Sequence, residues 1–180
     1  NMLPEFIIAC DSSAAAIACS LIFNLRDRYR TCIKKIIMFS PWLDVSRSSK
    51  IISAKKMSDE VINSDILRKS SSLYTYESNT NSPYISPLLA ENDVLENFPP
   101  VFIQMGEKEI LLDGAKEFKR KLEETGCKCQ LDVWTDMMFM FQMADEYLHQ
   151  SHLALDKVGK IVTSDCDCGT AIQIENKPKL

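Results

Sequence analysis

The sequence predicts an α/β domain with a mostly parallel sheet and flanking helices. Four short apolar runs of strand length recur along the 180 residues, and each is followed by helical material. This alternation is typical of a parallel sheet whose strands are joined by helical crossovers. With 46% hydrophobic residues, the chain is long enough for one domain with a core and too short for two comfortable ones.

The first two strands precede the middle of the chain. The first is the apolar run Glu5–Cys10, which feeds a helix over Ala14–Leu25. That helix is apolar nearly all the way round and is closed by the charged segment 26–28, which predicts a buried strand followed by a buried helix. The second strand is Lys35–Ser40, and it ends at Pro41.

Two further strands and two helices follow in the second half. The strands are Pro100–Gly106 and Gln130–Trp134. Apolar residues at helical spacing predict an amphipathic surface helix over Asp113–Thr125, with Gly126 at its C-cap. A last helix is expected over Met143–Val162.

A long excursion separates the second strand from the third. Residues Val45–Phe98 are rich in Ser, Asn and Asp, with partial helical patterning only at Asp59–Leu67. This length exceeds a plain connection in a compact domain and predicts a cap-like insertion. We therefore expect one domain over residues 1–162, with the cap at 45–98, and a disordered tail over 163–180.

Charge and hydropathy exclude two classes of partner. The net charge is −4, from 21 basic and 25 acidic residues, and the basic residues are scattered, so nucleic acid is not expected. The best apolar stretch, Ser13–Phe23, falls short of the roughly 20 residues that a membrane span needs. The chain opens with Asn1 and carries no signal-peptide pattern, which suggests a piece of a longer protein.

The cysteines favour a reduced, cytoplasmic setting. Their number, seven, is odd, and Cys10, Cys19 and Cys32 lie within apolar stretches, which argues against a disulfide framework. The others lack both CxxC spacing and a partnering histidine, so we expect no metal site and no cofactor. They are Cys127, Cys129, Cys166 and Cys168.

The segment Asp11–Ala15 joins the first strand to the first helix. A serine on such a strand-to-helix turn can form a nucleophile elbow, which presents its hydroxyl above the sheet. Cys10 and Ala14 stand where the usual motif has glycines. From this segment alone, a helix N-cap is the favoured explanation for Ser12, because serine is common at that position.

Several separated segments together resemble the fold-3 branch of the α/β-hydrolases, which includes hormone-sensitive lipase and many microbial esterases. Four of these segments match, in order, the family's GDSAGG, LSPWLDL and SPYISPL stretches and the strand that delivers the acid. The combined match runs from about Pro4 to Val162. These segments are Cys10–Ala15, Phe39–Asp44, Ser82–Leu88 and Pro99–Gly106. The resemblance implies a partial α/β-hydrolase fold with an inserted cap-like segment, and carboxylic-ester hydrolysis.

The resemblance also assigns roles. Ser12 stands at the family's nucleophile and Glu109 at the acid that orients a histidine, with a solvated loop charge as the alternative explanation for Glu109. Asp113 is better explained as the first-turn charge of the following helix. Phe139, in Asp136–Gln142, stands where the family has its histidine, and phenylalanine cannot act as a base.

Neither histidine is expected to replace the missing base. His149 and His152 lie ten and thirteen positions beyond Phe139 (149 − 139 and 152 − 139), which is on the order of 15 Å or more along a helix. Within these 180 residues there is also no HGGG-type oxyanion loop, and only 11 residues precede Ser12. We therefore expect impaired turnover, in the manner of a pseudoenzyme or a fragment.

Two functional hypotheses remain open from the sequence. In the first, the protein is a serine esterase whose excursion forms an acyl pocket for a small apolar ester. In the second, it is a non-catalytic relic that binds an apolar ligand or a partner chain. The apolar edge at Phe6–Ala9 also predicts self-association, because soluble proteins normally cover such edges.

Overall fold

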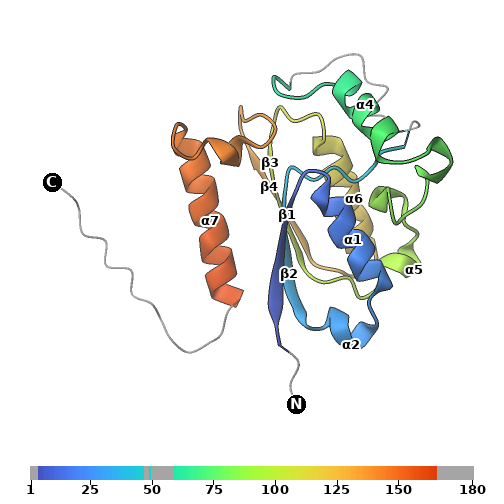
Figure 1. Ribbon diagram of the computed structural model, residues 1–180. Helices are drawn as coiled ribbons and strands as arrows, with labels where there is room; N and C mark the ends of the chain where they lie inside the picture. Colours follow the sequence, from blue (N-terminus) through green and yellow to red (C-terminus); the bar gives the residue numbers. More distant parts are fainter. Residues whose placement is uncertain (1–3, 47–48, 50–58, 166–180) are drawn as a thin grey trace.

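The computed structural model describes residues 4–46, 49 and 59–165. Its centre is a single four-stranded sheet formed by β1 (Phe6–Asp11), β2 (Ile33–Phe39), β3 (Val101–Gly106) and β4 (Cys129–Trp134). The strands lie in the order β1-β2-β3-β4 and every pair is parallel (Figure 1). The predicted fold class is confirmed, and all four strands end at the same edge of the sheet.

Helices and short 3-10 turns fill the connections. The α-helices are α1 (Ala14–Asn24), α2 (Asp27–Arg30), α4 (Ser64–Tyr74), α5 (Asn92–Leu95), α6 (Leu112–Glu124) and α7 (His149–Asp165). The 3-10 turns are η1 (Glu77–Asn79), η2 (Pro87–Leu89) and η3 (Phe141–Ala144).

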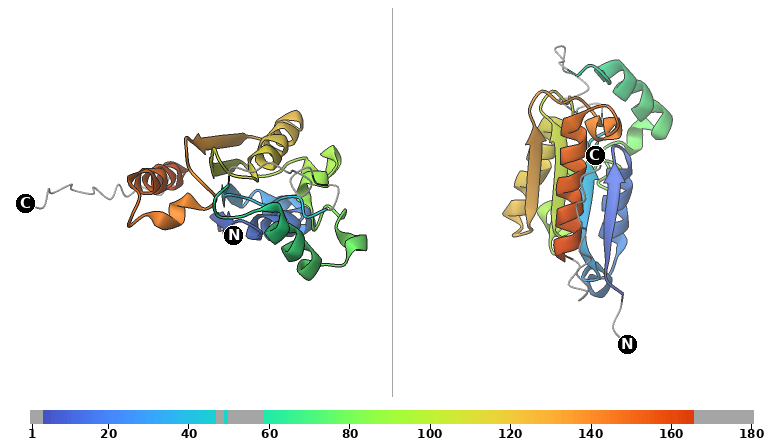
Figure 2. Two further views of the ribbon diagram at one scale, coloured as in Figure 1. Left: turned by 90° about the horizontal axis from the view of Figure 1, so that it is seen from above. Right: turned by 90° about the vertical axis from the view of Figure 1, so that its left-hand side faces the viewer.

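Helices cover both faces of the sheet (Figure 1, Figure 2). On one face, α1 and α6 form the main core with side chains such as Ile36 and Met38 of β2. On the other face, Val158 of α7 packs with Ile37 and Phe102. Neighbouring residues of β2 thus point to opposite faces, as the period of a strand requires. All six residues of β3 are buried because it is a central strand covered on both sides.

The first strand and helix are less buried than the sequence predicts. β1 is an edge strand, with Phe6 45% exposed, and no strand in the described part of the chain pairs with its outer side. On α1, Ile17 and Leu21 are 60% and 51% exposed. An all-round apolar helix is expected to be buried on every side, but the described residues cover only the side that faces the sheet.

Some boundaries also differ from the predicted ones. α1 ends at Asn24 because Leu25 is extended, and the charged residues that follow form the separate helix α2. α4 begins later than the predicted patterning, since the Asn63 side chain caps it by accepting from the Ile66 N–H. α7 begins at His149 rather than Met143, because η3 occupies the preceding turn. The first three residues of the predicted tail, 163–165, belong instead to α7, and the rest of that tail lies outside the described residues.

Buried serines dock the excursion onto the domain. Ser71 of α4 donates to the carbonyl oxygen of Val45 at 2.6 Å, and the Val45 N–H donates to Ser86 Oγ at 3.1 Å. Ser86 in turn donates to the carbonyl oxygen of Thr80 at 2.6 Å. Serine side chains of this Ser-rich segment therefore form hydrogen bonds with buried backbone groups of the excursion itself.

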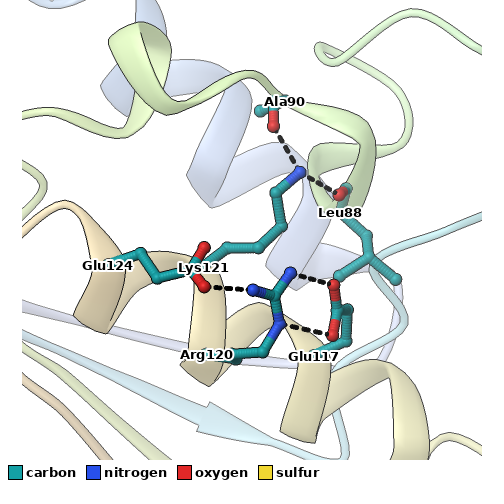
Figure 3. A network of polar contacts seen from close by, with 6 residues as sticks. All are labelled: Leu88, Ala90, Glu117, Arg120, Lys121 and Glu124. Carbon is teal, nitrogen blue, oxygen red and sulfur yellow. Dashed lines mark hydrogen bonds and ion pairs between the residues drawn. The ribbon is translucent and has the colours of Figure 1, made fainter.

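Lys121 of α6 fastens the other end of the excursion. Its Nζ donates to the carbonyl oxygens of Leu88 and Ala90, at 2.9 and 2.5 Å (Figure 3). The neighbouring Arg120 forms a two-pronged ion pair with Glu117 on the outer side of the helix (Figure 3). No helix of the described residues is long and apolar enough to cross a membrane.

Candidate active site

Ser12 lies immediately beyond β1, at the carboxyl edge of the sheet. Its backbone is left-handed, with φ of 42°, a conformation that costs a residue bearing a Cβ about 1–3 kcal/mol. Its N–H donates to the carbonyl oxygen of Phe39 at 2.9 Å, and its own carbonyl oxygen accepts from the Trp42 N–H at 2.9 Å. The N-cap of α1 is Ser13, whose side chain makes no capping hydrogen bond. A strained serine between strand and helix is the geometry of a nucleophile elbow.

Glu109 lies at the same edge, after β3, and is 5% exposed. Its Oε1 accepts two hydrogen bonds, from Ser40 Oγ at 2.8 Å and from the Gly106 N–H at 2.6 Å. Its Oε2 is buried and has no hydrogen-bond partner among the described residues. Glu109 is therefore not a solvated loop charge. It is a buried carboxyl group whose Oε1 accepts two hydrogen bonds and whose Oε2 accepts none from the described residues.

Burial raises the pKa of Glu109 to about 8. The hydrogen bonds from Gly106 and Ser40 lower this pKa, and the nearby charge of Asp59 raises it slightly. The cost of burying an ionised carboxylate outweighs the two hydrogen bonds, so Glu109 is largely protonated at neutral pH.

Ser40 connects the pieces of this edge. It is fully buried, and its backbone is left-handed with φ of 46°. While its Oγ donates to Glu109, the same oxygen accepts from the Met140 N–H at 3.1 Å. The preceding residue, Phe39, holds the Ser12 backbone. Phe39 at the end of β2 and Ser40 directly after it thus link the Ser12 turn to the Glu109 carboxyl group.

The segment that carries Phe139 crosses directly over this carboxyl group. At one end, the Met137 carbonyl oxygen accepts from the Lys108 N–H at 3.0 Å, and it lies 2.2 Å from where a Cβ on Gly106 would stand. At the other end, Met140 is bound to Ser40. The first anchor, Lys108, directly precedes Glu109, and the second, Ser40, is hydrogen-bonded to it. Phe139 lies between them, half-buried against the main core.

A buried polar network fixes the far side of that segment. Gln104 of β3, fully buried, donates to Asp132 Oδ2 and to the Ala154 carbonyl oxygen, both at 3.1 Å. Its Oε1 accepts from Gln142 Nε2 at 3.2 Å, and Lys157 of α7 pairs with Asp132. These contacts join β3, β4, η3 and α7, and they hold the residues that follow the Phe139 segment.

The remaining candidates are exposed, and no contact among the described residues joins them to Ser12, Ser40 or Glu109. His152 is exposed on α7, where its Nδ1 lies 3.0 Å from Asp145, and His149 is exposed at the start of the same helix. Asp113 is an exposed first-turn charge of α6 that pairs with Lys116, as predicted. No group of His, Cys, Asp and Glu in the described ranges is arranged to hold a metal ion.

Cys10 is not a rival nucleophile, although it lies two residues before Ser12. Burial raises the pKa of its thiol to about 12, with a further small increase from Asp11. A thiol in that state is protonated at neutral pH, and thiol reactivity depends on the thiolate.

A family model described as the alpha/beta hydrolase fold matches residues 4–143. The chain belongs to the α/β-hydrolase fold family. The resemblance to its hormone-sensitive-lipase-like branch, which the motifs predict, is confirmed. The matched range includes the Ser12 turn, the Glu109 loop and the Phe139 segment.

Two curated relatives carry ester-hydrolase names. An "Esterase" of Acinetobacter venetianus is 30% identical over 161 residues, which are 89% of this chain and 52% of the relative. An "Acetyl-hydrolase" of Streptomyces hygroscopicus is 24% identical over 152 residues, 84% of this chain and 50% of that protein. The chain thus spans about half the length of these relatives.

Solved structures agree on the fold. An esterase from the bacterial hormone-sensitive lipase family superposes with a TM-score of 0.78 at 24% identity, over 88% of this chain and 52% of that one. A hyperthermophilic esterase from Pyrobaculum calidifontis gives a TM-score of 0.78 at 20% identity over the same shares. At these identities the likeness concerns the fold alone.

Ser40 is a residue of this edge to which the sequence assigns no role. It stands inside the Phe39–Asp44 segment that carried part of the resemblance, directly before a proline. Its place within a matched segment is the feature of the sequence that could have indicated Ser40. Its partner, Glu109, is 69 residues away, and only the parallel order of β2 and β3 brings the two together.

Proposed function

We propose that this chain holds a carboxylic-ester hydrolase site that binds esters but, with Phe139 at the position of the base, turns them over poorly. The single observation that carries the proposal is the open Oε2 of Glu109 beside the Phe139 segment. In a serine hydrolase that carboxyl group orients an imidazole. The names of the two curated relatives support an ester as the substrate class.

The missing step is a proton transfer. For hydrolysis, Ser12 Oγ must attack the acyl carbon while its proton passes to a base, which later protonates the leaving alcohol. Phe139 can do neither. Glu109 does not substitute, because at neutral pH it is largely protonated and its Oε1 is already bound to Ser40 and Gly106.

Hydrolysis of a short activated ester, 4-nitrophenyl acetate, tests this proposal. The rate with the parent protein should equal the rate with its Ser12→Ala variant, after subtraction of the background. Loss of the base in a serine triad can cost on the order of 10⁶ in rate. A Ser12-dependent rate clearly above that of the variant would sink the proposal, provided both proteins show the same far-UV circular dichroism.

A second role, binding of another copy of this chain, has its own support. The outer edge of β1 is unpaired in the described part of the chain, and Ile17 and Leu21 are exposed beside it. Unpaired apolar edges favour strand addition. Sedimentation should therefore detect a concentration-dependent dimer, and Ile17→Glu with Leu21→Glu should weaken it. A monomer at all concentrations would contradict this role.

The domain limits and the setting belong to the same proposal. Residues 1–162 would form the hydrolase-like unit, with the excursion over 45–98 as its cap. A reducing, cytoplasmic setting is supported by the free thiols of the described cysteines, of which Cys19 and Cys32 are buried.

A further inference from the structure

Two adjoining clefts lie at the amino edge of the sheet, near α2 and opposite the edge that carries Ser12 and Glu109 (Figure 1). Their volumes are about 500 and 520 Å³, within the range of small-molecule sites. Lys34, Pro100 and Lys128 line both of them, so the two form one continuous surface. We call this surface the amino-edge cleft.

Basic side chains gather in this cleft. Lys34 is the second residue of β2, Lys128 directly precedes β4, and Arg30 is the last residue of α2. In the sequence these residues span 98 positions (128 − 30), and the parallel order of the strands brings them to the same edge. All three line the second cleft, and none of the described residues that line it is acidic. The cleft is therefore locally positive in a chain whose net charge is −4.

Two carboxylates near the cleft are already paired. Glu123, which lines the first cleft, forms an ion pair with Lys119 of the same helix. Glu5 lies 2.6 Å from Lys34, and the two side chains are 61% and 44% exposed. An ion pair this exposed is weak. An anion of higher charge can therefore take the place of Glu5 beside Lys34.

One of the three cations is held in a fixed position. Arg30 donates to three carbonyl oxygens, those of Leu25, Glu96 and Phe23, at 3.1, 3.0 and 3.3 Å. These bonds use three of the five N–H groups of the guanidinium and leave two for a ligand. Lys128 is exposed, and its ammonium has no partner among the described residues. Because Arg30 is already ordered, a ligand that binds it loses less conformational entropy.

We propose that the amino-edge cleft binds a small multivalent oxyanion, of the diphosphate or tricarboxylate kind, between Arg30, Lys34 and Lys128. The oxygens of such an anion accept charge-assisted hydrogen bonds from all three side chains. Its binding displaces Glu5 from Lys34. The cleft lies at the edge opposite Ser12, so this assignment does not depend on the proposed ester chemistry.

Isothermal titration calorimetry with inorganic pyrophosphate and with citrate, each in a low-salt buffer, tests this site. Lys128→Glu should weaken binding by at least about tenfold, because it turns an attraction into a repulsion. Lys160→Glu changes the net charge equally, at an exposed lysine of α7 outside the cleft, and should bind as the parent does. Glu5→Gln should tighten binding about threefold, since Lys34 loses its internal partner.

The control separates a site from a general effect of charge. Binding of either anion with this order of affinities supports the site, and the anion that binds more tightly identifies its chemistry. The absence of binding heat for both anions would overturn the proposal. Equal losses in Lys128→Glu and Lys160→Glu, with unchanged far-UV circular dichroism, would also overturn it, because only net charge would then matter.

Discussion

The protonation of Glu109 should make the stability of this protein fall as the pH rises. In the unfolded chain the carboxyl group loses its proton near its ordinary pKa of 4.5, whereas burial raises the pKa in the fold to about 8. Between these values the folded state holds the proton and the unfolded state does not. The contribution of Glu109 to the free energy of unfolding is therefore unchanged below pH 4.5. It decreases between pH 4.5 and pH 8 and is constant above pH 8.

The size of the effect follows from the gap of about 3.5 pH units. At about 1.36 kcal/mol per unit, full ionisation costs roughly 5 kcal/mol, of which about 3 kcal/mol falls between pH 5 and pH 8. This is a large share of the 5–15 kcal/mol that typically holds a domain together. The unpaired Oε2 is the physical source, because no described group compensates its charge.

Glu109→Gln isolates this titration from all others. The amide keeps the shape and can accept from Ser40 and Gly106, but it does not ionise. Urea unfolding followed by circular dichroism at pH 5, 6, 7, 8 and 9 gives the free energy of unfolding for both proteins. The parent should lose about 3 kcal/mol relative to the variant between pH 5 and pH 8. Parallel curves would refute the reasoning.

Three further changes test the surroundings of Glu109. Phe139→His should lower the Glu109 pKa, because an imidazole N–H can bind the open oxygen; an unchanged pH dependence of unfolding would argue against that placement. Ser40→Ala should cost about 1–3 kcal/mol in urea unfolding, since it leaves buried groups unpaired; a neutral result would exclude Ser40 as the connecting residue. Gly106→Ala should cost about 1–3 kcal/mol because its Cβ would meet a backbone oxygen at 2.2 Å, while Gly159→Ala, in open space, should be neutral or stabilising. Equal melting temperatures for the two glycine variants would contradict the close crossing.

The strands could be predicted from the sequence because each is a short apolar run that the sheet buries. The β3 strand is buried along its whole length, and its predicted bounds differ from the observed Val101–Gly106 by one residue. Exposure could not be predicted in the same way. Ile17 and Leu21 are apolar and yet exposed, since burial depends on what packs against α1 rather than on the residues themselves.

The site was partly predictable for a related reason. Ser12, Glu109 and Phe139 were assigned from the segments that resemble the family, and the parallel sheet brings these segments to one edge. The hydroxyl of Ser40, which connects them, bonds to residues 69 and 100 positions away. Local spacing carries no information about such contacts. The left-handed backbone at Ser12 and Ser40 also has no glycine to signal it.

Labelling by a fluorophosphonate tests the central claim most directly, because such a probe reacts with serines that a base has activated and largely ignores the rest. The account predicts that the folded chain and its Ser12→Ala variant label equally weakly, while an active serine esterase in the same gel labels strongly. Strong labelling of the parent that Ser12→Ala abolishes would contradict the account. It would mean that another residue, with His149 the first to be substituted, serves as the base.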